Sequence, residues 1–476
     1  MDLRPPNLIN SISLLNKSEK NKPSNDSSNS LRNQLKKIWI ESYGCSANFA
    51  DGEIVAGLLK KEGYELVDDS SQSDLNIIMT CSVKDATEHR MINRIQNLSN
   101  KPLVVAGCLP KAERKKVERL NPYASLIGPD SIARVNEVVK YSLLGKKMVH
   151  FDRNLAKINL PRIRINPIIS IVEIGSGCMS DCTFCQTKIA KGMIQSYRIG
   201  DIVRQIKNDV RAGCKEVWLT STDNGCYGLD HGTNLNNLLN ECCGIEGDFK
   251  IRVGMMNPMY LENLIEEMIE IYSNNDKIFK FIHIPVQSGS NKVLQDMKRD
   301  HDVNIIYESV KKFRKKIPQV TISTDIIVGF PSETDVDFEK TIDLVNDLQF
   351  DIVNISKYSS RPGTFASQMK KINTKTIKER SKSLNNLCRS IISKRNKKLW
   401  KNWVGEIIID EINHANNNII GRNYAYKSVL LTSKNMLHYG SAKEDTIDKF
   451  YYRLGDKIKI QVCGYSNYSL LGYPCQ

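Results

Sequence analysis

The sequence lacks the long apolar segments that membrane and secreted proteins carry. Nowhere do about 18 apolar residues follow one another, the length that a membrane-crossing helix needs. Residues 1–30 are rich in Asn, Ser, Lys and Pro and contain no apolar core of signal-peptide length. We therefore expect a cytoplasmic protein without a membrane anchor, in a reducing compartment where disulfides are rare.

Acidic residues are also in the minority, with 53 Asp and Glu against 68 Lys and Arg and a formal net charge of +15. This surplus favours a polyanionic partner, and nucleic acid is the first candidate, although a lysine-rich and asparagine-rich genome would also produce it. The 13 cysteines are odd in number and cannot all pair as disulfides. In a reducing compartment, clustered cysteines are typical of metal ligands or catalytic groups.

A chain of 476 residues is long for a single core, so two or three domains are expected. Residues 1–35 form a polar segment that we predict to be a disordered tail. Residues 36–146 then alternate buried strands with amphipathic helices, which predicts an open parallel sheet covered on both faces. The strands expected in it are Ile38–Glu41, Leu75–Met79, Leu103–Ala106 and Ser125–Ile127.

A second alternating series occupies residues 164–396. Six strands separated by amphipathic helices predict a partial (β/α)6 barrel with its chemistry at the C-terminal strand ends, and an open doubly wound sheet is the alternative. The expected strands are Ile168–Ile174, Glu216–Leu219, Ile251–Val253, Phe281–Ile284, Thr321–Val328 and Ile352–Ser356.

The C-terminal part is first basic and helical, then rich in short β segments. Lys370–Lys401 carries many cations and a single acid, Glu379. Residues 400–472 predict a small antiparallel β-barrel. Aromatic and cationic side chains in it suit single-stranded RNA, although a solvated helix and an ordinary β core would also explain them. These candidates are Arg422, Tyr424, Tyr426, Lys427, Lys434, Tyr439, Tyr465 and Tyr468.

One cysteine triad follows the first strand of the predicted barrel. Cys178, Cys182 and Cys185 have the spacing Cys-x3-Cys-x2-Cys. Three thiolates at this spacing can hold three irons of a cubane iron–sulfur cluster and leave the fourth iron open to S-adenosylmethionine. Zinc is the alternative, but zinc prefers four ligands and paired Cys-x2-Cys spacings, and no second pair or His completes such a set. We therefore favour a cluster.

A second triad is dispersed through the N-terminal domain. Cys45 comes just after the first predicted strand, and Cys81 and Cys108 directly follow two others. The ends of parallel strands meet at one edge of a sheet, which is the usual ligand-binding crevice of such folds. Buried structural cysteines would be scattered instead. We therefore predict a second three-thiolate cluster at this edge.

The segment Cys178–Cys185 resembles the signature of the radical S-adenosylmethionine (SAM) superfamily, and this resemblance implies that Phe184 lies near the adenine of the cofactor. The order of the three domains is similar to that of the methylthiotransferase family, whose C-terminal barrel is an RNA-binding TRAM domain. The resemblance covers about residues 36–472. Tyr43–Ser46, Ala50–Glu53 and Arg252–Pro258 are most similar to the archaeal and eukaryotic threonylcarbamoyladenosine tRNA methylthiotransferases. Ile284–Ser290 and Asp325–Pro331 have similar forms across the whole family.

The resemblance implies two [4Fe-4S] clusters and radical cleavage of SAM at the Cys178 triad. Hydrogen would be abstracted from C2 of threonylcarbamoyladenosine beside the anticodon of tRNA. Sulfur from the Cys45 triad would then be transferred to C2 with a methyl group from a second SAM. A reductant and a sulfur source are implied partners, and we expect a monomer. The alternatives are isopentenyladenosine or a ribosomal-protein aspartate as substrate, or a non-catalytic iron–sulfur RNA-binding protein.

Cofactor contacts are expected at three further strand ends. Ser221, Thr222, Asp223 and Asn224 could hold the methionine part of SAM by hydrogen bonds, or could form an ordinary polar turn. The resemblance also places cofactor or nucleoside contacts at Gln287, Ser288, Val328, Gly329 and Phe330. Lys357 and Arg361 could meet RNA phosphate or the threonyl carboxylate. We expect the other cysteines to be buried or incidental, although Cys226 lies close to the predicted cofactor loop. We expect His283 and His301 to be structural.

Overall fold

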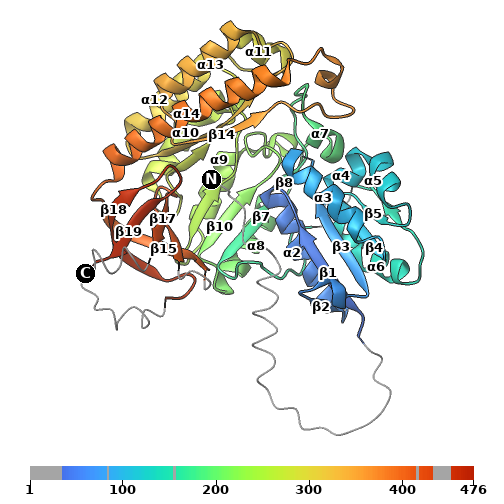
Figure 1. Cartoon of the computed structure of the whole chain (residues 1–476). Coiled ribbons are helices and arrows are strands. Elements are labelled where there is room, and N and C mark those ends of the chain that lie inside the picture. Colours follow the sequence, from blue (N-terminus) through green and yellow to red (C-terminus); the bar gives the residue numbers. More distant parts are fainter. Residues whose placement is uncertain (1–34, 83–84, 154–156, 414–417, 433–451, 476) are drawn as a thin grey trace.

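The computed structural model describes residues 35–82, 85–153, 157–413, 418–432 and 452–475. The predicted tail, apart from Leu35, lies outside these residues, as do the predicted RNA contacts Lys434 and Tyr439. The predicted order of an open sheet, a partial barrel and a small closed barrel is confirmed (Figure 1). Within the described residues, no helix has both the length and the apolar character to cross a membrane.

The N-terminal domain is a six-stranded parallel sheet in the order β2-β1-β3-β4-β5-β6. All four predicted strands are present, whereas the short strands β2 and β6 were not predicted. Strand β6 pairs with β5 and lies beyond the predicted domain end at residue 146. The strands are β1 (Lys37–Ser42), β2 (Glu65–Val67), β3 (Leu75–Thr80), β4 (Leu103–Gly107), β5 (Ser125–Ile127) and β6 (Val149–His150).

Helices cover both faces of this sheet, so its central strands β3 and β4 are buried along their whole length and mostly apolar. Along β3, Ile77 and Met79 belong to one buried cluster, and Ile78 between them belongs to another. This alternation follows from the two-residue period of a strand. The helices of the domain are α2 (Ser46–Lys61), α3 (Asp85–Asn97), α4 (Cys108–Ala112), α5 (Arg114–Leu120) and α6 (Val135–Leu143).

The central domain contains the six predicted strands, arranged as two parallel ladders, β11-β10-β7 and β12-β13-β14. A bridge between Ile251 and Ile278 connects them, and β7 and β14 remain the two open edges of a partial barrel. The strands are β7 (Ile169–Glu173), β10 (Glu216–Thr220), β11 (Lys250–Val253), β12 (Phe281–His283), β13 (Thr321–Val328) and β14 (Ile352–Lys357).

Helices surround this barrel because the strands bury apolar side chains on both faces. Two short antiparallel strands, β8 (Gly175–Ser176) and β9 (Gln195–Ser196), lie just beyond the C-terminal end of β7. The helices are α7 (Gln186–Lys191), α8 (Ile199–Arg211), α9 (Leu235–Cys243), α10 (Leu261–Asn274), α11 (Asn291–Asp296), α12 (Val303–Lys316), α13 (Asp335–Leu348) and α14 (Thr374–Trp400).

The C-terminal domain is a closed barrel in the order β15-β16-β17-β19-β18. Strands β17 and β19 pair in parallel, whereas the other pairs of this barrel are antiparallel as predicted. The barrel lies against the N-terminal ends of the central strands, where the amide of Lys280 donates to the carbonyl of Tyr424 at 2.8 Å. Its strands are β15 (Val404–Asn413), β16 (Asn418–Asn423), β17 (Ser428–Leu431), β18 (Lys457–Tyr465) and β19 (Leu470–Pro474).

Three residues predicted to contact RNA lie instead in this domain interface, so the prediction for them is wrong. Tyr426 is 2% exposed, Arg422 donates to Asp410 at 2.7 Å, and Lys427 donates to Asn396 at 3.2 Å. Part of the surface of a small barrel packs against the neighbouring domain. A pattern of aromatic and cationic residues does not show which of them lie in that contact and which remain exposed.

Tyr426 anchors the interface. Its ring centroid lies 4.9 Å from that of Phe279 and 5.1 Å from that of Phe281. The guanidinium of Arg252, on β11, lies over three rings, those of Trp218, Phe281 and Tyr426, at 5.2–5.4 Å. Aromatic contacts and a buried cation–π group therefore hold the small barrel in place.

We expect Tyr426→Ala to destabilise the protein by about 3 kcal/mol, the usual cost of truncating a buried aromatic side chain. Urea unfolding followed by tryptophan fluorescence measures this, because Trp218 lies 6.4 Å from the Tyr426 ring. Tyr468→Ala is the matched control in the same barrel, because Tyr468 is 56% exposed and its loss should change stability by at most about 0.5 kcal/mol. Equal effects of the two variants would contradict the interface role of Tyr426.

Candidate functional site

The cysteines of the N-terminal triad follow three neighbouring strands. Cys45 caps α2 just after β1, Cys81 directly follows β3, and Cys108 is the first residue of α4 after β4. Because β1, β3 and β4 are adjacent and parallel, their ends emerge side by side. Cys45 is exposed, whereas Cys81 and Cys108 are buried.

Glycines allow the backbone to approach this closely. Gly44 has φ +112°, and a Cβ on it would lie 2.2 Å from Cβ and 2.7 Å from Sγ of Cys81. Gly107 has φ +97°, and a Cβ on it would lie 2.4 Å from the carbonyl oxygen of Thr80. Each glycine directly precedes a triad cysteine, and only a residue without a side chain fits there.

Hydrogen bonds, burial and nearby charges shift the pKa of the thiols in this triad. The hydrogen bond from Cys81 lowers the pKa of the Cys45 thiol, and burial raises the pKa of the Cys108 thiol. The charge of Cys45 also contributes to the shift at Cys108, and the ammonium of Lys191 lowers the pKa of both groups. The structure thus brings together three thiols with a lysine beside them.

The triad of Cys178, Cys182 and Cys185 lies between β8 and α7, at the C-terminal ends of the barrel strands. Cys185 caps α7, and Nη1 of Arg299 donates to Sγ of Cys182 at 3.7 Å. Burial raises the pKa of the Cys182 and Cys185 thiols, and the charge of Cys178 raises both further. Here too the predicted residues lie together.

Cys226 is the feature of this site that sequence reasoning missed. Ligand atoms of Cys178, Asp223 and Cys226 all lie within 4.8 Å of one another. The hydrogen bond from Cys226 lowers the pKa of the Cys178 thiol. The sequence signal for Cys226 was its position two residues after the predicted cofactor loop. In the structure this loop comes close to Cys178.

The predicted cofactor loop carries buried polar atoms without partners among the described residues. They include the hydroxyls of Ser221 and Thr222 and Oδ1 of Asn224. Oδ1 of Asp223, in contrast, accepts from the amides of Gly225 at 2.9 Å and Asn257 at 3.0 Å. Unpaired buried polar atoms are costly, and their concentration beside Cys178 fits a polar ligand such as the methionine part of SAM.

The other predicted contacts lie at the ends of β12 and β13. Gln287 has φ +74° and is half-buried, whereas the Ser288 hydroxyl accepts from the amide of Ser290 at 3.2 Å. Val328 and Phe330 are fully buried.

Phe330 and Gly329 have partners within the protein. The ring of Phe330 lies 6.5 Å from that of Phe184. The amide of Gly329 donates to Glu333 at 2.8 Å. All of these proposed cofactor roles remain predictions.

The N-terminal domain covers the mouth of the barrel. Helix α4 packs against α7 (Figure 1), and Nε2 of Gln186 donates to Glu113 at 2.9 Å. Arg361, predicted to meet RNA or the threonyl carboxylate, is buried and pairs with Glu88 of α3. That prediction is wrong, because the cation is used in the domain contact. The two triads therefore face a common junction.

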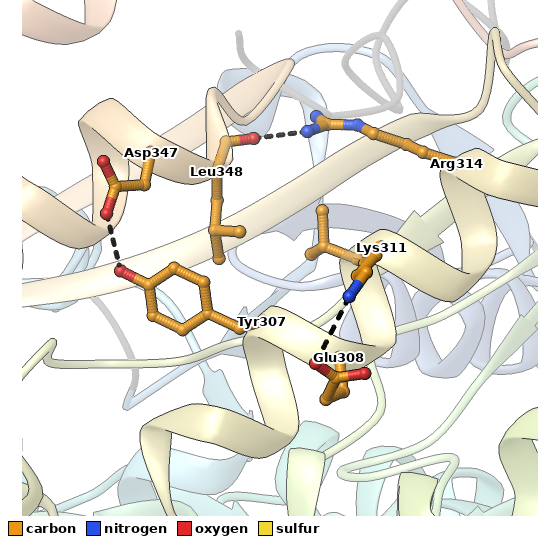
Figure 2. Close-up of a pocket in the computed structure, with 7 residues that line it drawn as sticks. Tyr307, Glu308, Lys311, Arg314, Asp347 and Leu348 are labelled. Carbon is orange, nitrogen blue, oxygen red and sulfur yellow. Dashed lines mark hydrogen bonds and ion pairs between the residues drawn. The ribbon is translucent and has the colours of Figure 1, made fainter.

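A separate hollow lies between α12 and α13, away from the cysteines (Figure 2). Its polar groups pair with each other: the Tyr307 hydroxyl donates to Asp347 at 3.1 Å, and Lys311 lies 4.0 Å from Glu308. Arg314 donates to the carbonyl of Leu348. We assign no role to this hollow.

Each triad offers three thiols and no fourth cysteine at equivalent spacing. Cys226 approaches Cys178 but comes from a different loop and lies beside the unpaired polar atoms of the cofactor loop. The donor set in both places therefore fits a cubane cluster with one iron left open. A closed zinc site would need four ligands.

Comparison with known proteins agrees with this geometry. A family model described as "Radical SAM superfamily" matches residues 172–345, and "Uncharacterized protein family UPF0004" matches residues 37–128. The chain is 41% identical over 396 residues to a "Probable threonylcarbamoyladenosine tRNA methylthiotransferase" of Pyrococcus abyssi, covering 82% of this chain and 92% of that protein. It is 38% identical over 428 residues to the "Threonylcarbamoyladenosine tRNA methylthiotransferase" of Homo sapiens, covering 87% and 72%.

Among solved structures, the fold is similar to the radical S-adenosylmethionine methyltransferase TsrM from Kitasatospora setae, which contains cobalamin and a [4Fe-4S] cluster. The TM-score is 0.53 at 12% identity, over 70% of this chain and 77% of that one. At this identity the likeness concerns the fold alone.

We expect Gly44→Ala to abolish iron binding at the N-terminal triad, because the added methyl group must displace Cys81. Anaerobic reconstitution followed by iron analysis should show a loss of about four irons per chain, one cubane. Gly63→Ala is the matched control, since Gly63 also has a positive φ of +94° but has no atom within 4 Å of the added Cβ. Full iron content in Gly44→Ala would contradict the close approach of the three thiols.

Proposed function

Because the chain belongs to the threonylcarbamoyladenosine tRNA methylthiotransferase family, whose core is a radical SAM domain, we propose that it adds a methylthio group to C2 of N6-threonylcarbamoyladenosine next to the anticodon of tRNA. The observation that carries this proposal is the presence of two three-thiol sets at one domain junction. A one-cluster radical enzyme has no use for the second set.

Cys178, Cys182 and Cys185 would hold one [4Fe-4S] cluster, and Cys45, Cys81 and Cys108 a second. When bound, the first would supply the electron for reductive cleavage of SAM, and the second an open iron that binds the sulfur to be transferred. The first set lies at the C-terminal strand ends of the barrel and the second at the strand ends of the N-terminal sheet, where such folds position their chemistry.

The cofactor loop supplies the polar contacts. The hydroxyls of Ser221 and Thr222 and Oδ1 of Asn224 are available to bind the amino and carboxylate groups of SAM. Asp223 keeps the loop in place through its bonds to two backbone amides. Phe184 would contact the adenine, with Phe330 packed against its ring at 6.5 Å.

Residues at the two following strand ends would complete the cavity. Gln287, Ser288, Val328 and Gly329 are proposed for the side where the nucleoside enters. Gln287 follows the end of β12 by four residues, and its positive φ marks a turn of the chain there.

The basic helix α14 offers a surface for the tRNA backbone. Most of its cations are exposed, whereas Arg380 pairs with Glu333 and Arg395 with Asp351. Exposed cations in a row suit phosphate, and binding through them depends on salt. The exposed set, including the flanks of the helix, is Lys370, Lys371, Lys375, Lys378, Lys382, Arg389, Lys394, Lys397, Lys398 and Lys401.

The decisive experiment is iron counting after anaerobic reconstitution. We expect Cys45→Ala/Cys81→Ala/Cys108→Ala to lose about half of the iron yet still cleave SAM. Cys178→Ala/Cys182→Ala/Cys185→Ala should also lose half of the iron and lose SAM cleavage. Full iron in the first variant would leave a single-cluster radical enzyme and refute the proposal.

Mass spectrometry of nucleosides from digested tRNA identifies the substrate. A methylthio group on threonylcarbamoyladenosine supports the proposal, whereas one on isopentenyladenosine or on a ribosomal-protein aspartate would replace the substrate named here. A protein that binds RNA and clusters but never cleaves SAM would be a binding protein instead.

We expect Lys378→Ala/Lys382→Ala to weaken tRNA binding at low salt, because the two exposed side chains lie one turn apart on α14. The slope of log K against log salt should become shallower by about 1.4, as for two lost contacts with single-stranded phosphate. Filter binding over a salt series measures it. Lys207→Ala/Arg211→Ala removes the same charge from α8, and an equal effect there would show that only net charge matters.

A further inference from the structure

A connected set of four buried charges lies at the junction of the two domains. The ammonium of Lys157 lies 2.9 Å from Asp51 on α2 and also pairs with Glu173 at the end of β7. The second oxygen of Glu173 accepts from Lys191 at 2.7 Å. None of the four is more than 7% exposed. Burying charges is costly, so this set calls for an explanation beyond stability.

Lys191 differs from Lys157 in how many partners it has. Lys157 bonds two carboxylates, whereas among the described residues Lys191 bonds Glu173 alone. An ammonium has three donors, so two of them remain for another acceptor. A buried cation with unused donors points to a negatively charged ligand beside it.

The surroundings of Lys191 identify where that ligand would lie. Lys191 ends α7, which packs against α4, the helix that begins with Cys108. The Lys191 charge lowers the pKa of both the Cys45 and the Cys108 thiols, while Asp51 and Glu173, each paired with a lysine, act in the opposite direction. The ammonium thus adjoins the N-terminal triad.

The other lysine near the end of α7 serves the other triad. Lys188 donates to the carbonyl of Cys178 and lies 3.4 Å from Asp181. Helix α7 begins directly after Cys185 and, with six residues, is about 9 Å long. Lys188 therefore supports the loop that carries Cys178, whereas the charge of Lys191 acts on the thiols of the N-terminal triad.

We propose that Lys191 binds the anionic sulfur ligand, sulfide or methanethiolate, that occupies the open side of the Cys45–Cys81–Cys108 site. This inference rests on the proposed function, since it needs a cluster at that triad. The ammonium donates a charge-assisted hydrogen bond to the sulfur and offsets its negative charge. Glu173 and Lys157 hold the ammonium in position.

The test uses full-length protein with Cys178→Ala/Cys182→Ala/Cys185→Ala, so that only the N-terminal cluster is present. Methanethiolate is titrated anaerobically and followed by the electron paramagnetic resonance of the reduced cluster. In Lys191→Met we expect the Kd to rise about tenfold or more, as for the loss of a hydrogen bond to a charged group. The reduction potential should fall, because a nearby positive charge stabilises the reduced cluster.

Lys191→Arg should restore both values, since it keeps the charge and the donors. The matched control is Lys280→Met, because Lys280 is also buried but donates to backbone carbonyls of Tyr272 and Asn275 at the opposite end of the barrel. Lys191→Gln serves as a second neutral variant should Lys191→Met not fold.

Several results would overturn the proposal. Unchanged thiolate affinity and potential in an iron-loaded Lys191→Met would show that the lysine does not contact the sulfur. Loss of iron in the Met, Gln and Arg variants alike would make Lys191 a folding residue. A parent protein without iron at this triad would refute the proposed function itself, whereas a parent that binds thiolate equally well with and without Lys191 refutes only this inference.

Discussion

The arrangement of the molecule depends on the dry, charged contact between the N-terminal domain and the barrel. Lys157 lies between a carboxylate of each domain, Asp51 and Glu173, and all three side chains are buried. Removing Lys157 would leave the carboxylate of Asp51 buried without the cation that pairs with it, which costs several kcal/mol. Apolar surfaces can slide over one another, but such a contact has a single geometry. It therefore fixes how the sheet edge that carries Cys45, Cys81 and Cys108 meets the mouth of the barrel.

The two triads are joined through short helices as well as through this contact. Helix α4 begins at Cys108 and α7 begins just after Cys185, and the two helices pack against each other. The helix that carries Cys108 therefore supports the helix that follows Cys185, and the reverse is also true. The sulfur transfer that we propose needs this proximity, because reacting groups must be held in a fixed orientation.

Much of this was readable in the sequence, because strands and their ends leave a periodic pattern. The six strands of the partial barrel and the placement of Cys45, Cys81 and Cys108 at strand ends follow from short apolar runs and the cysteines after them. Strands β2 and β6 are too short to leave such a pattern. The burial of Tyr426 and Arg361 could not be predicted, because it depends on which domain faces which. Cys226 approaches Cys178 only through the folding of a loop.

The short helix α7 acts as a spacer of fixed length between two sites with different chemistry. Adding one residue between Cys185 and Lys191 would rotate the lysine by about 100° around the helix axis and direct its ammonium away from Glu173 and the sulfur triad. Side chains on its exposed face, such as Ile189, are free to vary. The length of this helix, rather than its exposed surface, therefore sets how Lys191 lies relative to Cys185, and an insertion or a deletion here would separate the two.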